Sequence, residues 1–443
     1  MRKHVSGVPV SVWAFLLGVA PLPLYGFSSG PPPLRTGAAV DGGLNCTACH
    51  RTFAPANSGK GNISITSASY TPGAKLNILI TLQDPDAQRW GFQLTARLRS
   101  DETKEAGTFT VAAPLRVRCE NGDNAPCGRG KEFIEHTAAA TQVGTRNQGS
   151  FTIEWTAPEQ DVGEIVLYAA GNAANGDGTP NGDHIYTTSA VIRPACTLTQ
   201  KPAIKGVTDA ASFQSTISPN SLISVFGGPF PGSGYSYSAY ASDLAAGRWP
   251  TSLGCVAVEI GGQRVPVFFV SQGQINAQAP PSIATGPADV TVILNPGAPN
   301  EVRSLAAKTQ VANHSPAFFL VDSKHIAAVD ASNQNLIVGV QGAAKPGDIV
   351  TMFGTGFGGA APPLAAGEFP SGPTPLHDPV TVVVGGITLA LADLSYAGLS
   401  PWAPGVCQFN IRLPASLPSG DIPVKIRIGS AETQDGAVLA VSR

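Results

Sequence analysis

The sequence predicts an all-β protein made of three β-sandwich modules in tandem. Gly (50) and Pro (38) are abundant, whereas only 13% of the 443 residues are charged. That balance favours short strands joined by many turns. Apolar and polar residues also alternate over short stretches, which is typical of half-buried strands. A chain of this length exceeds one ordinary core and divides into about three domains of roughly 100–150 residues each.

The N-terminus predicts export. A basic start (MRKH) precedes an apolar run over residues 8–25, and small polar residues follow. This is the arrangement of a secretory signal peptide, which we assign to residues 1–30. A membrane anchor is the alternative, but three prolines in the run break the long apolar helix that spanning requires. We therefore expect a secreted, periplasmic or surface protein with no membrane span after signal cleavage.

Charge and motif content exclude several classes of function. The formal net charge is -2, and no Lys/Arg cluster is interleaved with aromatics. We therefore expect no nucleic-acid partner. The chain also lacks a GxSxG elbow, an HExxH pair and a phosphate-binding glycine loop, so no catalytic constellation is recognised and we expect a non-enzyme.

The first module follows a Pro/Gly-rich segment, residues 31–61, whose first part to residue 45 is expected to be a tether or coil. The module itself is assigned to residues 62–196. Its strands are expected where period-two patterns are bounded by Pro and Gly. These stretches are residues 63–70, 75–82, 90–98, 107–111, 149–155 and 163–170.

An internal repeat predicts two further modules of one kind. Three motifs recur in the same order at a separation of about 124 to 134 residues. SLISVFGGPF at 221–230 returns as DIVTMFGTGF at 348–357, VAVEIGG at 256–262 as VTVVVGG at 380–386, and QINAQAP at 274–280 as QFNIRLP at 408–414. Two copies of one β-sandwich are the direct interpretation. We assign them to residues 206–300 and 315–443, after a turn-rich linker at 197–206.

Residues 46–50 read CTACH, the pattern of covalent haem attachment. The thiols of Cys46 and Cys49 can add across the two vinyl groups of one haem, and His50 is placed to ligate its iron. An exported protein meets the oxidising conditions that permit such attachment. The sequence therefore predicts one haem c for electron transfer or redox sensing, with a redox partner that it does not identify.

Three alternatives stay open for the two cysteines. A thioredoxin-type redox pair expects a strand and a helix around it, and a zinc site needs further ligands at knuckle spacing. A tight disulfide between Cys46 and Cys49 is the strongest alternative. Under it, the chain is a non-catalytic surface or adhesion protein that binds an extracellular ligand.

A protein-derived sixth ligand to the iron is expected to be a histidine. Apart from residue 1, the only methionine is Met352, which belongs to the C-terminal repeat. His136 and His184 are the two candidates in the first module, and a hydrogen-bonded strand histidine is an equal interpretation of His136. An open sixth position would instead suggest binding of a small ligand. Three further histidines lie in the other modules and are expected to be surface or packing residues: His314, His325 and His377.

The other cysteines and one polar loop complete the candidate residues. Cys119 and Cys127 flank a short loop and are predicted to form a local disulfide. Cys196, Cys255 and Cys407 have no obvious pairing, and a buried free thiol is the simplest state for them. Residues 171–183 crowd oxygen ligands that suit calcium, but the terminal Glu of an EF-hand is missing, and a solvated turn-rich loop is favoured. Those oxygen ligands are Asn172, Asn175, Asp177, Asn181 and Asp183.

Six motifs in the first module carry a family resemblance. They are YTPG at 70–73, RWGFQLTAR at 89–97, GTF at 107–109, FIEHT at 133–137, WTAP at 155–158 and YAAGNAAN at 168–175. On these motifs, residues 46–190 resemble a Reeler (reelin N-terminal-like) domain. The resemblance implies an immunoglobulin-like sandwich and no known catalytic mechanism. In similar bacterial members, a CxxCH stands just before the first strand.

The repeated modules carry a second resemblance. Its motifs are AASF at 210–213, SPNSLISVF at 218–226, LGCVAV at 253–258 and VSQGQINAQAP at 270–280. They resemble the Solibacter-type C-terminal domain of secreted bacterial proteins. Each half is also similar to an IPT/TIG immunoglobulin-like domain, most clearly in GDIVTMFGTGFG at 347–358. Cys255 replaces an expected Gly and Cys407 an expected aromatic, so an interdomain disulfide between them is one hypothesis. The resemblance implies spacers or binding platforms with no identified ligand.

Overall fold

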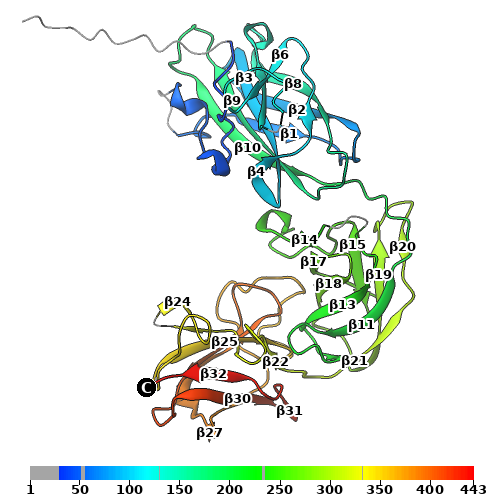
Figure 1. Cartoon of the computed structure of the whole chain (residues 1–443), viewed down its shortest axis with the longest axis vertical. Helices are drawn as coiled ribbons and strands as arrows, with labels where there is room; N and C mark the ends of the chain where they lie inside the picture. The colour runs from blue at the N-terminus through cyan, green and yellow to red at the C-terminus, as the bar shows by residue number, and fades with distance from the viewer. Residues whose placement is uncertain (1–28, 51–54, 129, 232–234, 332) are drawn as a thin grey trace, which may run out of the picture.

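The computed structural model describes residues 29–50, 55–128, 130–231, 235–331 and 333–443. Three β-sandwich modules follow one another along the chain (Figure 1), which confirms the all-β class. The predicted signal peptide lies almost wholly outside the described residues. No helix within the described residues is long and apolar enough to cross a membrane. The helical elements there are short 3-10 turns, namely η1 (Ala39–Asp41), η2 (Cys46–Ala48), η3 (Ala138–Ala140), η4 (Ala241–Asp243) and η5 (Leu391–Asp393).

The first module packs a four-stranded sheet against a larger one. The first sheet has the order β1 (Asn62–Thr66), β2 (Lys75–Asp84), β8 (Asn147–Thr156), β5 (Thr108–Phe109). The second has the order β10 (His184–Ile192), β9 (Ile165–Ala174), β3 (Arg89–Leu98), β7 (Glu132–His136), β6 (Leu115–Cys119), with β4 (Asp101–Glu105) pairing β3. Alternate residues of β2 are buried, as the period-two pattern predicts. The apolar faces of the two sheets enclose Trp90 and Trp155 in the core.

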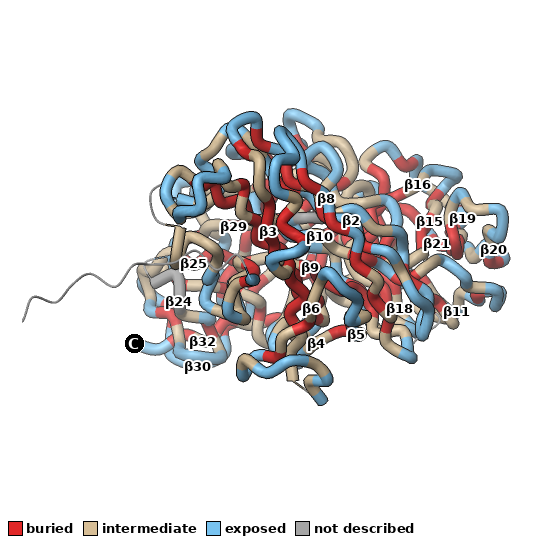
Figure 2. Tube along the Cα trace, turned by 90° about the horizontal axis from the view of Figure 1, so that it is seen from above, coloured by how far each residue is buried: buried red, intermediate tan, exposed pale blue. Residues whose placement is uncertain are grey.

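Strand β3 is buried on both faces, and buried residues follow it in Figure 2. Its apolar face lines the core, whereas Gln93 and Arg97 on its polar face are covered by residues 29–50. Gln93 Nε2 donates to the carbonyl of Pro32 (2.9 Å), and Arg97 Nη2 lies 2.8 Å from Asp41 Oδ2. A buried guanidinium needs a carboxylate partner. The segment expected to be a tether is therefore a packed layer of the module, because these polar groups have to be satisfied.

The second module is also a two-sheet sandwich. One sheet has the order β11 (Ala203–Asp209), β13 (Leu222–Gly228), β18 (Gln274–Gln278), β17 (Val267–Val270), β14 (Tyr237–Ser238). The other has the order β12 (Thr216–Ile217), β21 (Ala307–Val311), β19 (Gly286–Leu294), β15 (Val256–Ile260), β16 (Gln263–Val265), with β20 (Val302–Arg303) on β19. Because β21 pairs with β19, the module runs past the boundary at residue 300 that we expected.

The third module repeats this plan. Its first sheet has the order β24 (Asn333–Ile337), β23 (Ala328–Asp330), β25 (Ile349–Thr355), β29 (Cys407–Arg412), β28 (Leu394–Leu399), with β22 (Ala317–Phe318) on β25. The second has the order β27 (Ile387–Thr388), β26 (Val380–Val384), β30 (Gly420–Ile428), β31 (Ala431–Glu432), with β32 (Val438–Val441) on β30.

The three repeated motifs occupy equivalent places in these two modules. The first and third motifs pair as β13 with β18 in one module and as β25 with β29 in the other. The second motif forms β15, which pairs with β19, and β26, which pairs with β30. The same apolar alternation thus builds the same sheet positions twice, since alternate residues of each strand face the core.

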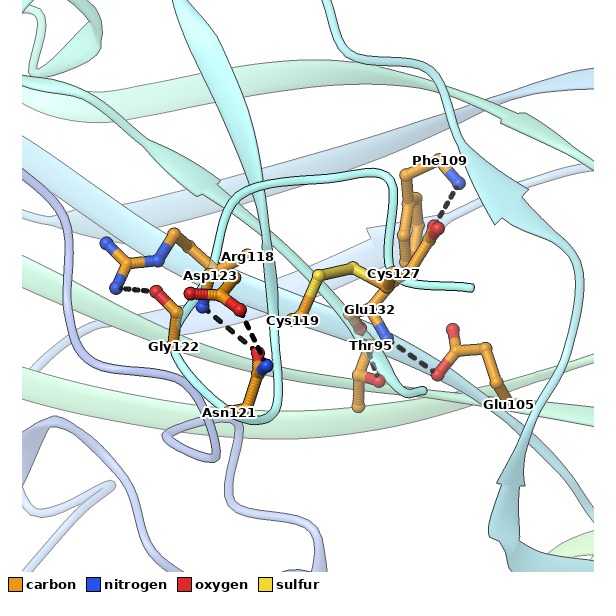
Figure 3. Close-up of a disulfide and its surroundings, with 10 residues drawn as sticks. All are labelled: Thr95, Glu105, Phe109, Arg118, Cys119, Asn121, Gly122, Asp123, Cys127 and Glu132. Carbon is orange, nitrogen blue, oxygen red and sulfur yellow. Dashed lines mark hydrogen bonds between the residues drawn. A yellow bond between two sulfur atoms is a disulfide. The ribbon is translucent and has the colours of Figure 1, made fainter. Parts of the chain in front are cut away.

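Two disulfides are present among the described cysteines. Cys119 and Cys127 close the loop that follows β6, as Figure 3 shows. Cys196 pairs with Cys255, 59 residues away, and so ties the linker before β11 to the second module. The hypothesis that Cys255 pairs with Cys407 is wrong, because Cys407 is a buried free thiol in the core of the third module.

Candidate functional site

The CTACH sequence forms a tight turn at the start of the first module. Asn45 caps η2, since its side-chain oxygen accepts a hydrogen bond from the backbone nitrogen of Thr47 (2.9 Å). The backbone nitrogens of Cys49 and His50 both donate to the carbonyl of Cys46, at 3.2 and 3.1 Å. These bonds bring Cys46, Cys49 and His50 to the wall of a single cavity.

Both cysteines of the turn are free thiols. The disulfide considered as the alternative is thus not formed in this structure. Burial, together with the nearby Cys49, raises the pKa of the Cys46 thiol to about 12. The Cys46 sulfur therefore stays protonated at neutral pH.

His50 is held by a buried carboxylate. Its Nδ1 lies 2.7 Å from Oδ2 of Asp183, whose side chain is only 2% exposed. The other Asp183 oxygen accepts from the backbone nitrogen of Asn175 (3.1 Å), and the side-chain nitrogen of Asn172 lies 3.4 Å from each ring nitrogen of His50. A carboxylate on Nδ1 fixes the tautomer and the orientation of an imidazole, which leaves Nε2 for a metal.

Asp183 was considered in the sequence only as a calcium ligand, and its contact with His50 was missed. Residues 171–174 belong to β9, so the polar loop is shorter than expected. Its carboxylates accept hydrogen bonds from nearby groups: Asp183 from Asn175, and Asp177 from Thr179. The histidine of a CxxCH motif needs a hydrogen-bond acceptor for its second ring nitrogen. This requirement is the signal in the sequence that could have pointed to a carboxylate such as Asp183.

His136 ends β7 and lines the same cavity, with 8% of its surface exposed. Its Nδ1 lies 2.9 Å from the backbone nitrogen and 3.1 Å from the carbonyl oxygen of Phe92. Burial lowers the pKa of His136 to about 4, and positive charges at Arg116 and Arg89 lower it further. The imidazole is therefore neutral at neutral pH, as a metal ligand must be.

His184 is placed elsewhere. In the register of β10 and β9 it pairs with Ala173, so its side chain lies on the same face as that of Ala173. The side chain of Asn172, the next residue of β9, lies on the opposite face. His184 Nδ1 lies 2.5 Å from Oδ2 of Asp84, which also accepts from the Tyr186 hydroxyl (2.6 Å). The ligand atoms of Asp84, Asp86 and His184 lie within 4.8 Å of one another. His184 does not line the cavity of the CTACH turn.

The cavity lies between the CTACH turn and the outer face of the larger sheet. The space inside it that a water-sized molecule can occupy is about 120 Å³, and the cavity is open to solvent on one side. Arg35 and Arg89 line it, and neither forms an ion pair with any described residue. The Arg35 Nε and Asn172 Oδ1 atoms are buried without a hydrogen-bond partner among the described residues. Buried polar atoms are normally satisfied, so these two are suited to a bound ligand.

The remaining histidines and the methionine of the third module take no part in this site. His314 lies 2.9 Å from Asp378, and His325 lies 2.6 Å from Asp322, both as ion-pair geometries with carboxylates. Met352 is fully buried in the core of the module.

A family model matches the first module. Residues 45–171 match the Reeler domain, so the resemblance carried by the six motifs is confirmed for that part of the chain. The match spans the CTACH turn, the strands β1 to β8 and the first part of β9. No curated protein matches the chain.

Solved structures similar to the chain include domains of F-spondin and a bacterial cohesin. A human F-spondin reeler domain is 18% identical, covers 32% of this chain and 94% of its own, and gives a TM-score of 0.23. The Reelin-N domain of F-spondin is 21% identical, covers 34% and 98%, and gives 0.22. The seventh ScaB type I cohesin from Pseudobacteroides cellulosolvens is 13% identical, covers 31% and 94%, and gives 0.21. Likeness at this level carries no functional argument.

Proposed function

We propose that this chain is an extracytoplasmic protein whose Reeler module carries one covalently attached haem, for electron transfer or redox sensing. The observation that carries the proposal is that a single cavity gathers Cys46, Cys49, His50 and His136. The motif and His136 are 86 residues apart along the sequence, so their meeting at one cavity is a property of the fold and independent of the motif itself.

The donor set and the charges of the cavity fit a haem. Two thiols and an imidazole within one turn match the attachment chemistry, and Pro31 and Pro32 belong to the same cavity wall. Arg35 and Arg89 supply cations without carboxylate partners among the described residues. The two carboxylates of a haem are the complementary charges, because a guanidinium binds a carboxylate in bidentate geometry.

Attachment would use the two cysteines as thiols. Each S–H adds across one vinyl C=C bond: a carbon–sulfur bond forms, and the proton goes to the other vinyl carbon. Nothing is oxidised or reduced in this addition, so free thiols are the required starting state. His50, oriented by Asp183, would hold the iron from the protein side. The bound group supplies a one-electron carrier, which this chain's own residues lack.

A second candidate function is a non-catalytic surface or adhesion protein that binds an extracellular ligand. The Reeler match favours this candidate, since such a domain suggests an extracellular binding protein. The two disulfides fit folding in an oxidising compartment. Under this candidate Cys46 and Cys49 form a third disulfide after export, and the modules present a binding surface to a polymer or a protein.

An absorption spectrum and an intact mass separate the two candidates. The full chain is exported from cells that make cytochrome c maturation proteins, beside Cys46→Ala/Cys49→Ala as the matched control. A Soret band and a haem-sized mass gain in the wild type, both lost in the control, are expected. A colourless wild-type protein whose mass fits three disulfides would overturn the haem proposal and favour the adhesion candidate.

A further inference from the structure

Two histidines approach the cavity beside directly paired residues of neighbouring strands. The His50 ring lies against the side chain of Asn172 on β9, and the His136 ring lies against Gly91 on β3. Gly91 and Asn172 are opposite each other in the register of these strands. Opposed residues share a face of the sheet and lie about 4.5–5.5 Å apart. The two imidazoles are therefore neighbours at one cavity.

Both rings are held through Nδ1. His50 Nδ1 contacts Asp183, and His136 Nδ1 contacts the backbone of Phe92, whose carbonyl oxygen lies 3.1 Å away. Histidines that ligate metals commonly donate their other ring N–H to a carboxylate or a backbone carbonyl. His136 Nε2 makes no hydrogen bond or ion pair with any described residue. In the tautomer that donates its Nδ1–H to the Phe92 carbonyl, His136 Nε2 carries the lone pair of a ligand atom, whereas His50 Nε2 has the 3.4 Å contact with Asn172 beside it.

Gly91 makes room for the His136 ring. A Cβ at this position would lie 2.6 Å from Cε1 and 2.9 Å from Nε2 of His136, far inside normal contact. Gly91 is outside the left-handed region that favours glycine, since its φ is not positive. The backbone conformation therefore suits any residue at this position. Glycine is required because the His136 ring leaves no room for a Cβ.

We infer that His136 is the second protein ligand to the haem iron, an inference that rests on the proposed haem site. His50 and His136 would both hold the iron, which would leave it no position for a small ligand and would suit electron transfer. Two imidazoles also set a lower reduction potential than His and Met, since a Met ligand raises it. His184, the other candidate, lies on the opposite face with Asp84.

Spectroscopy of the haem-loaded full chain tests the assignment. The variants are His136→Ala, His136→Met and, as matched control, His184→Gln. Wild type and His184→Gln are expected to show a low-spin ferric spectrum and no carbon monoxide binding in the ferrous state. His136→Ala is expected to turn high-spin, to bind carbon monoxide, and to return to low-spin when imidazole is added. His136→Met is expected to stay low-spin with a raised reduction potential.

The outcomes separate this inference from the proposed function. Haem in every variant, with unchanged low-spin spectra and potentials in both His136 variants, overturns the assignment alone. A high-spin spectrum in His184→Gln but not in His136→Ala overturns it in favour of His184. A wild-type protein without haem overturns the proposed function and this inference together. If His136→Ala fails to fold, the reduction potential of His136→Met tests the assignment instead. Replacing a histidine by methionine raises the potential only where that residue ligates the iron.

Discussion

Replacing Gly91 with alanine places one methyl group against the His136 ring. The new Cβ would lie 2.6 Å from Cε1, 2.9 Å from Nε2 and 3.1 Å from Nδ1. Carbon atoms prefer about 3.5–4.0 Å, so the ring has to move by about 1 Å to restore contact. Its Nδ1 lies 2.9 Å from the backbone nitrogen of Phe92. The movement therefore breaks a buried hydrogen bond as well as crowding the cavity wall.

Two costs add up in the free energy of unfolding of the first module. Overpacking of a buried position costs about 1–3 kcal/mol, and loss of a buried hydrogen bond costs about 1 kcal/mol. We therefore expect Gly91→Ala to destabilise the module by about 2–4 kcal/mol. In the double variant Gly91→Ala/His136→Ala the ring is gone, so the methyl group meets no obstacle. The double variant should be more stable than the sum of the single effects predicts, by about 1–3 kcal/mol.

The assay is urea unfolding of the full chain without haem, with hydrogen exchange read on peptides of β3 so that the first module is followed by itself. Gly206→Ala is the matched control, because a Cβ there meets no atom within 4 Å and its φ is not positive. The control should change the stability of its module by no more than about 0.5 kcal/mol. Additive effects in the double variant, or a Gly91→Ala as benign as the control, would refute the proposed contact.

Three further predictions follow from other parts of the structure. Because burial lowers the pKa of His136 to about 4, the contribution of the neutral ring is complete above the unfolded pKa and is lost as pH falls towards 4. Relative to His136→Gln, the first module should lose up to about 3 kcal/mol between pH 6.5 and 4, measured by urea titration. Removing the Cys196–Cys255 disulfide, whose cysteines are 59 residues apart, should cost roughly 4 kcal/mol in the second module. Removing the Cys119–Cys127 disulfide, whose cysteines are 8 residues apart, should cost roughly 2.5 kcal/mol in the first. An equal effect of both would contradict the loop-entropy argument. Asp41→Ala should cost about 3 kcal/mol by leaving the fully buried Arg97 short of a carboxylate, and residues 29–50 should become the first site of limited proteolysis; unchanged protection would show that this ion pair does not hold the segment.

Most strands of the first module could be predicted from local pattern. The stretches expected at 75–82, 90–98 and 149–155 are β2, β3 and β8 with ends shifted by at most two residues. Period-two alternation works here because side chains of a strand point to opposite faces in turn. The repeat predicted two similar modules for the same reason, because the same alternation occurs in both copies.

Contacts between distant residues could not be predicted. The partner of Arg97 lies 56 residues away, and that of Cys255 lies 59 residues away. Alternation of polar and apolar residues is typical of half-buried strands, yet residues 29–50 bury the polar face of β3 as well. No local pattern marks such a cover, because it depends on where the fold brings an irregular segment.

The sequence by itself determined the attachment chemistry of the proposed site, because Cys46, Cys49 and His50 are contiguous and one turn of backbone is enough to bring them together. Only the tertiary structure decided between His136 and His184. Sequence spacing treats the two alike, but the fold brings His136 to the cavity wall and holds His184 beside Asp84, outside that cavity. The orienting contact of Asp183 with His50 spans 133 residues. It exists because β9 and β10 return the chain to the same edge of the sheet, where a half-buried imidazole and a buried carboxylate satisfy each other.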